Sequence, residues 1–303
     1  MIYFPNGNEE ISLLKFIGKY QYLNRNDIKY FFSTSSYYRK RISNLITGKY
    51  IRRKGTNYVM TKNGARYLKS LNHTYNRLNP NQKYLPRLLF ISNFAAFYHN
   101  CSTVKFTPSF DIKNNDSYTM TSRRYIGLLN INGTTYLTYK ITKEHDKKYI
   151  SSVIYDIQKE KDYKNIIILV DDISSVQLLD FSFGYNQVLI VEDNETNREK
   201  LKYLNSINWP LIIKNEYKKP LLSTYNYCDY IDIRNKLISF FYFIDTEKIN
   251  RILLFLRENK NKCVDIVCNK EMKTELQNII PRAKYNVLDL DKLIDRKRNI
   301  YYE

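Results

Sequence analysis

The sequence predicts a mixed α and β protein, in which an α+β N-terminal domain is followed by a larger α/β domain. Apolar residues recur at helical spacing as far as Leu71, and one short basic hairpin interrupts them. From Lys105 onward, strand patterns alternate with helix patterns. The chain has 303 residues, of which 43% are hydrophobic, and this is enough for two domains with cores of their own.

Two helices are expected at the N-terminus. The first is amphipathic and begins after Glu9, and Tyr20–Asn24 forms the turn that follows it. The second covers Asp27–Phe32, and either Asn24 or Asn26 caps its first turn. Together with a third helix, these segments would form a three-helix core.

The third helix is expected over Ser36–Thr47. The Ser/Thr cluster at Ser33–Ser36 offers N-cap oxygens, and Gly48 follows as the C-cap. The residues of its buried stripe are Tyr38, Ile42, Leu45 and Ile46. The residues of its basic, solvated face are Tyr37, Arg39, Lys40, Arg41 and Asn44.

A basic two-stranded hairpin follows this helix. Its first strand begins in Lys49–Arg53, Lys54–Asn57 is the turn, and Tyr58–Met60 is the returning strand. Thr61 then caps a closing helix over Lys62–Leu71. This order of helices, hairpin and closing helix resembles a winged helix-turn-helix domain.

The charge of the chain favours a polyanionic partner. Lys and Arg number 49 against 30 Asp and Glu, so the net charge is +19 and the surface attracts nucleic acid. In a winged helix-turn-helix domain the third helix enters the major groove of double-stranded DNA, and the hairpin contacts the backbone or the minor groove. The alternative is that the basic residues form only a solvated face. The resemblance implies base contacts from Ser35, Ser36, Tyr37, Arg39, Lys40 and Asn44. It implies phosphate contacts from Arg41, Lys49, Arg52, Arg53, Lys54 and Lys62.

We expect a linker at residues 73–86, between a DNA-binding domain at 1–72 and an α/β domain at 87–303, because this segment is rich in Asn and Pro. Asn132-Gly133 predicts a tight hairpin turn in the second domain. The predicted helices are Arg87–Asn100, Tyr149–Lys159, Thr196–Leu204, Thr246–Glu258 and Lys270–Ile280. The predicted strands are Lys105–Phe110, Arg123–Asn130, Thr134–Thr142, Ile166–Val170, Val188–Val191, Leu211–Lys214, Leu237–Phe243, Val264–Val267 and Tyr285–Leu290.

Several classes of function lack support in the sequence. No Gly-rich phosphate loop precedes a predicted helix, so no nucleotide cofactor is expected. The four cysteines include no C-x-x-C pair, so no zinc site is expected and the thiols are expected to be reduced. No apolar run approaches the roughly 18 to 20 residues of a spanning helix, and the N-terminus lacks a signal-peptide pattern. We therefore expect a cytoplasmic protein with no membrane partner.

The order of elements over roughly residues 9–172 resembles the plasmid replication-relaxation family. Members of that family pair an N-terminal winged helix-turn-helix with a domain similar to the PD-(D/E)xK restriction-endonuclease fold. The resemblance implies a DNA-binding accessory factor in plasmid replication, or in relaxation at a transfer origin. It also implies that the second domain engages DNA, a relaxase or replication protein, or a second copy of the chain.

The catalytic positions of such a nuclease are degenerate in this chain. The nuclease needs an Asp at the start of its second strand and a Glu/Asp-x-Lys on its third, which hold Mg²⁺ and orient the attacking water. Arg123 stands at the first position, and Thr138 stands at the acidic position before Lys140. We therefore expect no metal site and no cleavage. Either Arg123, Arg124 and Lys140 grip a phosphate backbone, or they are ordinary exposed strand residues. The alternative metal ligands nearby in the sequence are Asp111, Asp116, Glu144 and Asp146.

Two acidic pairs follow predicted strands of the second domain. Asp171 and Asp172 follow one strand, and Glu192 and Asp193 follow the next. Such strand ends are where α/β enzymes place ligands, so the four carboxylates could form a metal cluster of another kind. Capping of the helices that come next explains them better.

The sequence therefore predicts a sequence-specific DNA-binding protein without enzyme activity, acting in replication or transfer of a plasmid or mobile element. One alternative is a winged-helix transcriptional regulator with a C-terminal sensing domain. The other is a metal-dependent DNA nuclease. A homodimer is compatible with the first two readings, because winged helices often bind paired half-sites.

Overall fold

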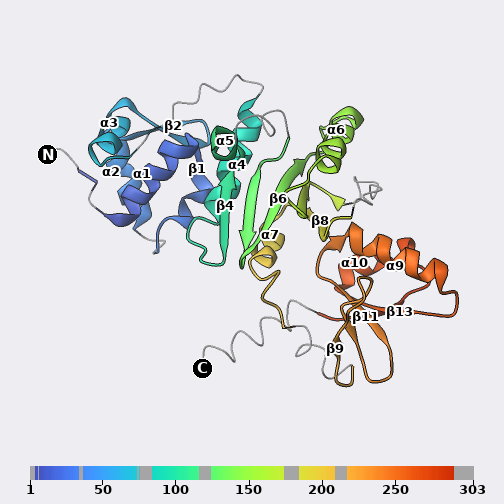
Figure 1. Ribbon diagram of the computed structural model, residues 1–303. Coiled ribbons are helices and arrows are strands. Elements are labelled where there is room, and N and C mark those ends of the chain that lie inside the picture. Colours follow the sequence, from blue (N-terminus) through green and yellow to red (C-terminus); the bar gives the residue numbers. More distant parts are fainter. Residues whose placement is uncertain are drawn as a thin grey trace. The chain divides into compact units, whose positions relative to one another are not determined.

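The computed structural model describes residues 4–5, 7–33, 37–73, 75, 84–115, 124–173, 184–208 and 217–289. Within these residues the chain is a mixed α and β protein with three β-sheets, so the predicted fold class is confirmed at this level. The chain divides into two compact units, Met1–Ser117 and Tyr118–Glu303. Figure 1 colours them along the sequence, from blue in the first unit to red at the end of the second.

The helices predicted at the N-terminus are present in the first unit. Their bounds are α1 (Asn8–Tyr20), the 3₁₀ helix η1 (Arg25–Tyr30), α2 (Tyr38–Thr47) and α3 (Lys62–Ser70). Leu13, Leu14 and Ile17 on α1 are fully buried, as are Leu45 on α2 and Leu68 on α3. Complete burial of each such side chain contributes about 1.5–3 kcal/mol, so packing stabilises these short helices more than intrinsic propensity does.

A small antiparallel sheet completes this arrangement. Its strands are β1 (Leu23–Asn24), β2 (Ile51–Lys54) and β3 (Asn57–Met60), in the order β1-β3-β2. β2 and β3 are the predicted hairpin, and Gly55 in its turn has a left-handed φ of 59°. β1 occupies a segment where we expected only a turn, and it pairs Leu23 with Tyr58 and Asn24 with Asn57. A strand of two residues is too short to show the alternation from which strands are predicted.

The N-cap predictions are correct for two helices and wrong for a third, α2, whose predicted C-cap Gly48 is confirmed. Asn24 caps η1 and Thr61 caps α3, each through a side-chain oxygen that accepts a backbone N–H. Ser33 does not cap α2, because its N–H and its hydroxyl both donate to Oε1 of Glu9 on α1, at 2.8 and 2.9 Å. The N-cap position of α2 is Tyr37, which makes no side-chain capping bond. The rest of the predicted Ser/Thr cap lies outside the described residues.

The first unit does not end at the predicted linker 73–86, most of which lies outside the described residues. It continues through α4 (Leu85–Phe97), β4 (Val104–Pro108) and α5 (Ser109–Asn115). The Ser92 hydroxyl on α4 donates to the backbone oxygen of Tyr22, and the Asn100 side chain donates to the backbone oxygen of Tyr30 at 2.7 Å. We expected α4 to be the first helix packed on the sheet of the second domain, but it packs mainly on β1 and η1 of the first unit. Asn and Pro mark irregular chain and do not indicate which core the next helix joins.

The second unit contains a sheet in which β12, β8, β7, β6 and β5 are neighbours in that order. Its first elements are β5 (Gly127–Ile131), β6 (Thr134–Ile141), α6 (Lys147–Gln158), β7 (Asn165–Val170), β8 (Gln187–Glu192) and α7 (Glu195–Leu201). The predicted hairpin turn is confirmed, because Asn132 and Gly133 have φ angles of 48° and 87°. β6, β7 and β8 run parallel, so their carboxyl ends meet at one edge of the sheet.

A second sheet in this unit was not predicted as separate. Its strands are β9 (Leu221–Leu222), β10 (Tyr230–Ile231), β11 (Leu237–Phe241), β13 (Val264–Cys268) and β14 (Lys284–Val287). β12 (Ile244–Asp245) follows β11 but pairs with β8 of the other sheet. The helices α9 (Thr246–Glu258) and α10 (Lys270–Ile279) agree with their predictions, and Figure 1 shows both near β11 and β13. The predicted strand at 211–214 lies outside the described residues.

Two further findings concern membrane-spanning helices and the state of the cysteines. In the described ranges, no helix has both the length and the apolar character needed to cross a membrane. All four cysteines are free thiols. Cys228 and Cys268 are buried, whereas Cys101 and Cys263 are half-buried.

Gly64 provides a test of the packing between α3 and the hairpin. A Cβ at this position would overlap the backbone oxygen of Tyr50 and the sulfur of Met60. Because the backbone oxygen cannot rotate away, we expect Gly64→Ala to destabilise the first unit by about 2 kcal/mol. Hydrogen exchange at the α3 amides of the full chain measures this change. Asn63→Ala, at the exposed neighbouring position, is the control and should change stability by less than about 0.5 kcal/mol. Equal effects of the two variants would contradict the prediction.

Candidate nucleic-acid interface

An open groove of about 860 Å³ lies between η1, α2 and the β2–β3 hairpin of the first unit. Four arginines line it, and among the described residues of its wall there is no Asp or Glu. The arginines are Arg25, Arg39, Arg52 and Arg53. Amide and hydroxyl groups, such as those of Asn26 and Ser43, occupy much of the remaining wall. Like charges gathered in this way create a positive potential that attracts anions.

All four of these arginines are exposed to solvent. Arg39 is exposed on α2, a helix that buries Leu45 in the core. Arg52 and Arg53 are exposed on β2, which is an edge strand of the small sheet. Ile51, at the start of β2, is almost fully buried and anchors the strand. The groove therefore has one wall from a helix and one from a hairpin.

Arg25 is the groove residue that the sequence analysis missed. It is the first residue of η1, and its N–H donates to the backbone oxygen of Thr56 in the hairpin turn at 3.0 Å. The pairing of Asn24 with Asn57 brings it to this place. Its only sequence signal was its position after the cap residue Asn24, and nothing in the sequence placed that cap beside the hairpin.

The predicted DNA-contacting residues are mostly accessible. The exposed ones are Tyr37, Arg39, Lys40, Lys49, Arg52, Arg53, Lys54 and Lys62. Asn44 is half-buried, and Ser35 and Ser36 lie outside the described residues. The groove brings together Arg39, Arg52 and Arg53, and the other exposed residues stand outside its wall.

We predicted that Arg41 contacts a DNA phosphate, but in the structure it binds Glu9. Its Nη1 lies 2.5 Å from Oε2 of Glu9 on α1, and its guanidinium carbon is 5.8 Å from the centre of the Phe32 ring. Hydrogen bonds from Ser33, together with the charge of Arg41, hold the pKa of Glu9 below its ordinary value. Arg41 thus joins α2 to α1 and orients the helix that carries Arg39.

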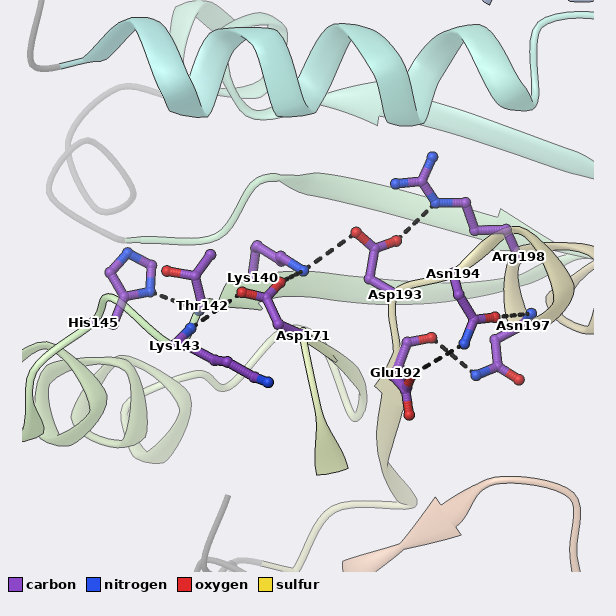
Figure 2. A network of polar contacts seen from close by, with 10 residues as sticks. All are labelled: Lys140, Thr142, Lys143, His145, Asp171, Glu192, Asp193, Asn194, Asn197 and Arg198. Atoms are coloured by element: carbon purple, nitrogen blue, oxygen red, sulfur yellow. Dashed lines mark hydrogen bonds and ion pairs between the residues drawn. The ribbon is translucent and has the colours of Figure 1, made fainter. Parts of the chain in front are cut away.

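A polar network lies at the carboxyl ends of β6, β7 and β8 in the second unit (Figure 2). Nζ of Lys140 is 2.6 Å from Oδ1 of Asp171 and 3.2 Å from Oδ2 of Asp193. Nε of Arg198 on α7 lies 2.7 Å from the other Asp193 oxygen. The side chains of Lys140 and Asp193 are only 9% and 8% exposed. Lys140, Arg198 and Asp193 therefore compensate one another largely away from water, whereas Asp171 is 38% exposed.

The groups around this network favour its ionised form. The Lys143 N–H donates to Oδ2 of Asp171 at 3.1 Å. Burial opposes ionisation of Asp171, but the hydrogen bonds from Lys140 and Lys143 outweigh it and lower the pKa of the carboxyl. Nearby, Nδ1 of His145 accepts the Thr142 N–H at 2.9 Å, as Figure 2 shows, and burial lowers the pKa of the imidazole.

The predicted phosphate contact of Lys140 is wrong. Its ammonium lies between the carboxylates of Asp171 and Asp193. If the ammonium moved away to bind a phosphate, the buried carboxylate of Asp193 would lose this partner. Arg124 is also engaged, because its backbone N–H and its Nη1 lie 2.9 and 3.4 Å from Oδ2 of Asp156. Arg123 lies outside the described residues.

Glu192 and Asp193 do not cap α7 as we expected, and residues 174–183, which follow the other acidic pair, lie outside the described residues. Asn194 caps α7 by accepting the Asn197 N–H at 2.8 Å. Asp171 and Asp193 instead form ion pairs with the Lys140 ammonium. The parts of the chain that the structure describes contain no group of three or more His, Cys, Asp or Glu able to hold a metal ion.

Two of the four alternative metal ligands of the sequence analysis have other roles, and Glu144 is an exposed residue between β6 and α6. Asp146 caps α6 by accepting the Tyr149 N–H at 2.7 Å. Asp111 lies in the first unit and pairs with Lys19 at 2.5 Å. Asp116 lies outside the described residues. Asp111 and Asp146 are therefore not members of the Lys140 network.

Comparisons with protein-family models, with curated proteins and with solved structures found no match to this chain. The resemblance to the plasmid replication-relaxation family therefore stays a prediction from the order of elements. The function proposed for the chain is argued from the basic groove and the Lys140 network.

Lys140→Met should destabilise the second unit by about 3 kcal/mol, because the buried carboxylate of Asp193 loses a charged partner. Urea unfolding of the full chain measures the loss. The control is Lys143→Met, since this ammonium is 62% exposed and pairs with Asp172 near the surface. The control should cost less than about 1 kcal/mol. A Lys140→Met chain as stable as the wild type would contradict a compensating role for this ammonium.

The lowered pKa of His145 predicts a pH dependence. The folded state disfavours the imidazolium, so its stabilising contribution is present above the ordinary pKa of about 6.5 and is lost as the pH falls below it. Asp171 stays ionised in this range because its own pKa is lowered. His145→Asn keeps an acceptor for the Thr142 N–H but cannot titrate. We expect the stability of the second unit to fall between pH 7 and about pH 5 in the wild type and to fall less in the variant. Identical pH profiles by urea unfolding would refute this expectation.

Proposed function

We propose that the first unit is a winged helix-turn-helix domain that binds double-stranded DNA through the basic groove. The observation that carries this proposal is the convergence of four arginines on one open groove whose described wall holds no carboxylate. The three N-terminal helices, the sheet order β1-β3-β2 and the basic hairpin support it. The net charge of +19 adds long-range attraction to the phosphate backbone.

In this proposal α2 enters the major groove and the hairpin follows the backbone. Arg39 and Asn44 contact base edges, where guanidinium and amide groups can form paired hydrogen bonds with guanine and adenine. Arg25, Arg52 and Arg53 contact phosphates across the groove. The ion pair between Arg41 and Glu9 holds α2 against α1.

The proposal for the second unit is a restriction-endonuclease-like α/β fold that serves assembly and does not cleave DNA. The order of the β5–β6 hairpin, α6 and the parallel strand β7 supports the resemblance. Lys140 compensates Asp171 and Asp193, so these carboxylates already have a cation. The whole chain would then act as an accessory factor in replication or transfer of a plasmid or mobile element. Its partner would be a relaxase, a replication protein or a second copy of the chain.

Selection of bound fragments from the source genome or plasmid tests the proposal. Purified full-length protein would be used at physiological salt, with Mg²⁺ present and absent. We expect repeated copies of one site beside replication or transfer genes, without cutting in either arm. A site at a single promoter would favour a transcriptional regulator instead. Absence of sequence preference would contradict the role of α2, and cutting that depends on Mg²⁺ would contradict the role of Lys140.

Single substitutions should separate base contacts from phosphate contacts. Arg39→Ala and Asn44→Ala should each cost about 1–3 kcal/mol on the selected site and relax its base preference. Arg52→Ala and Lys54→Ala should weaken binding to selected and random DNA alike. Fluorescence anisotropy titrations at several salt concentrations measure both effects.

The control for these titrations is Lys69→Ala. Lys69 is exposed near the end of α3 and lies outside the groove, so its loss should change the affinity by much less than that of Arg52. Equal losses on selected and random DNA for all four groove and helix variants would remove the distinction between the two kinds of contact.

A further inference from the structure

The first unit contains a second cavity, separate from the basic groove. Its volume is about 480 Å³, which is within the range of small-molecule sites. It lies between α1, the end of α4 and the start of β4, and shares no lining residue with the groove. The DNA-binding proposal makes no use of it.

The floor of this cavity is apolar. Phe16 and Tyr20 of α1 contribute buried rings that stack on each other, with centroids 4.4 Å apart. Ala95 near the end of α4 and Tyr98 just after it are also buried and line the cavity. A ligand that fills this space must therefore offer an apolar body, and a flat ring matches walls that are themselves rings.

The rim of the cavity is cationic. Lys15 on α1 and Lys105 on β4 are both exposed and line the cavity. Neither ammonium has an ion-pair partner in the described ranges of the chain. The third lysine of the lining differs, because Lys19 is paired with Asp111 at 2.5 Å. Two ammonium groups are therefore available to an anion at the mouth of an apolar space.

One wall carries a neutral polar pair. The Ser12 hydroxyl and Nε2 of His99 are 2.7 Å apart. The imidazole stacks on Phe31 at 4.3 Å and meets the edge of Phe16 at 5.6 Å, so its ring is held in place. Burial lowers the pKa of His99, and the cation is therefore disfavoured there. This pair can exchange hydrogen bonds with a ligand without adding charge.

We propose that this cavity binds a small aromatic monocarboxylate. The ring lies on the floor formed by Phe16, Tyr20 and Ala95, and the carboxylate lies between Lys15 and Lys105. A bare phosphate lacks the apolar body that the floor requires, and a neutral ring leaves the ammonium groups without a counter-ion. Because the ligand would contact α1 and β4 together, it joins the N-terminal helices to the segment that follows α4.

Benzoate is the probe that tests this site, titrated into the full-length protein without DNA by isothermal calorimetry. We expect saturable binding with one site per chain. Benzamide, which has the same shape without the charge, should bind at least about tenfold more weakly. Inorganic phosphate should not displace benzoate. Because DNA is absent, the result is independent of the DNA-binding proposal.

The double variant Lys15→Gln/Lys105→Gln should weaken benzoate binding by at least about tenfold. The matched control is Lys69→Gln/Lys161→Gln, which removes two exposed lysines that do not line the cavity and should bind as the wild type does. Both variants lie at exposed positions and should keep the wild-type circular dichroism spectrum. Failure of benzoate to saturate the protein, equal binding by the two double variants, or displacement by phosphate would overturn the proposal.

Discussion

The pairing of β1 with β3 is the constraint on which the basic groove depends. Two residues of β1 align with the returning strand of the hairpin, so the chain must enter η1 beside the hairpin turn. Arg25 is the next residue, and its backbone N–H binds the Thr56 oxygen there. Without this pairing, Arg25 and the arginines of β2 would belong to unconnected segments. A ladder of two residue pairs therefore determines which cations share one groove.

The two units use their cations in opposite ways. In the first, the arginines of the groove face solvent and their wall offers no carboxylate among the described residues, which keeps the positive potential available to a ligand. In the second, Lys140 is held between Asp171 and Asp193, and Arg198 binds the latter. Removal of a charge from water requires a partner of opposite sign, so the buried lysine acts as an internal counter-ion.

Arg41 is intermediate between the exposed arginines of the groove and the buried Lys140. Its guanidinium is half-buried and binds Glu9, whose other carboxylate oxygen accepts two hydrogen bonds from Ser33. One carboxylate on α1 thus binds both Ser33, which precedes α2 in the chain, and Arg41 on α2. A basic residue on a solvated helix face can therefore orient the helix instead of contacting the ligand, and sequence spacing does not distinguish the two roles.

The sequence by itself determined the elements whose signals are local. The Thr61 cap, the Asn132-Gly133 turn and the apolar strand over Ile166–Val170 depend on neighbouring residues, and each is present. Only the tertiary structure decided the pairing of β1, the packing of α4 on β1 and η1, and the division of the later strands between two sheets. The same is true of the partners of Lys140, which lie 31 and 53 residues away along the chain. The spacing of apolar residues predicts which face of a helix or strand is buried. It does not predict which distant segment covers that face, because this depends on which surfaces meet when the chain folds.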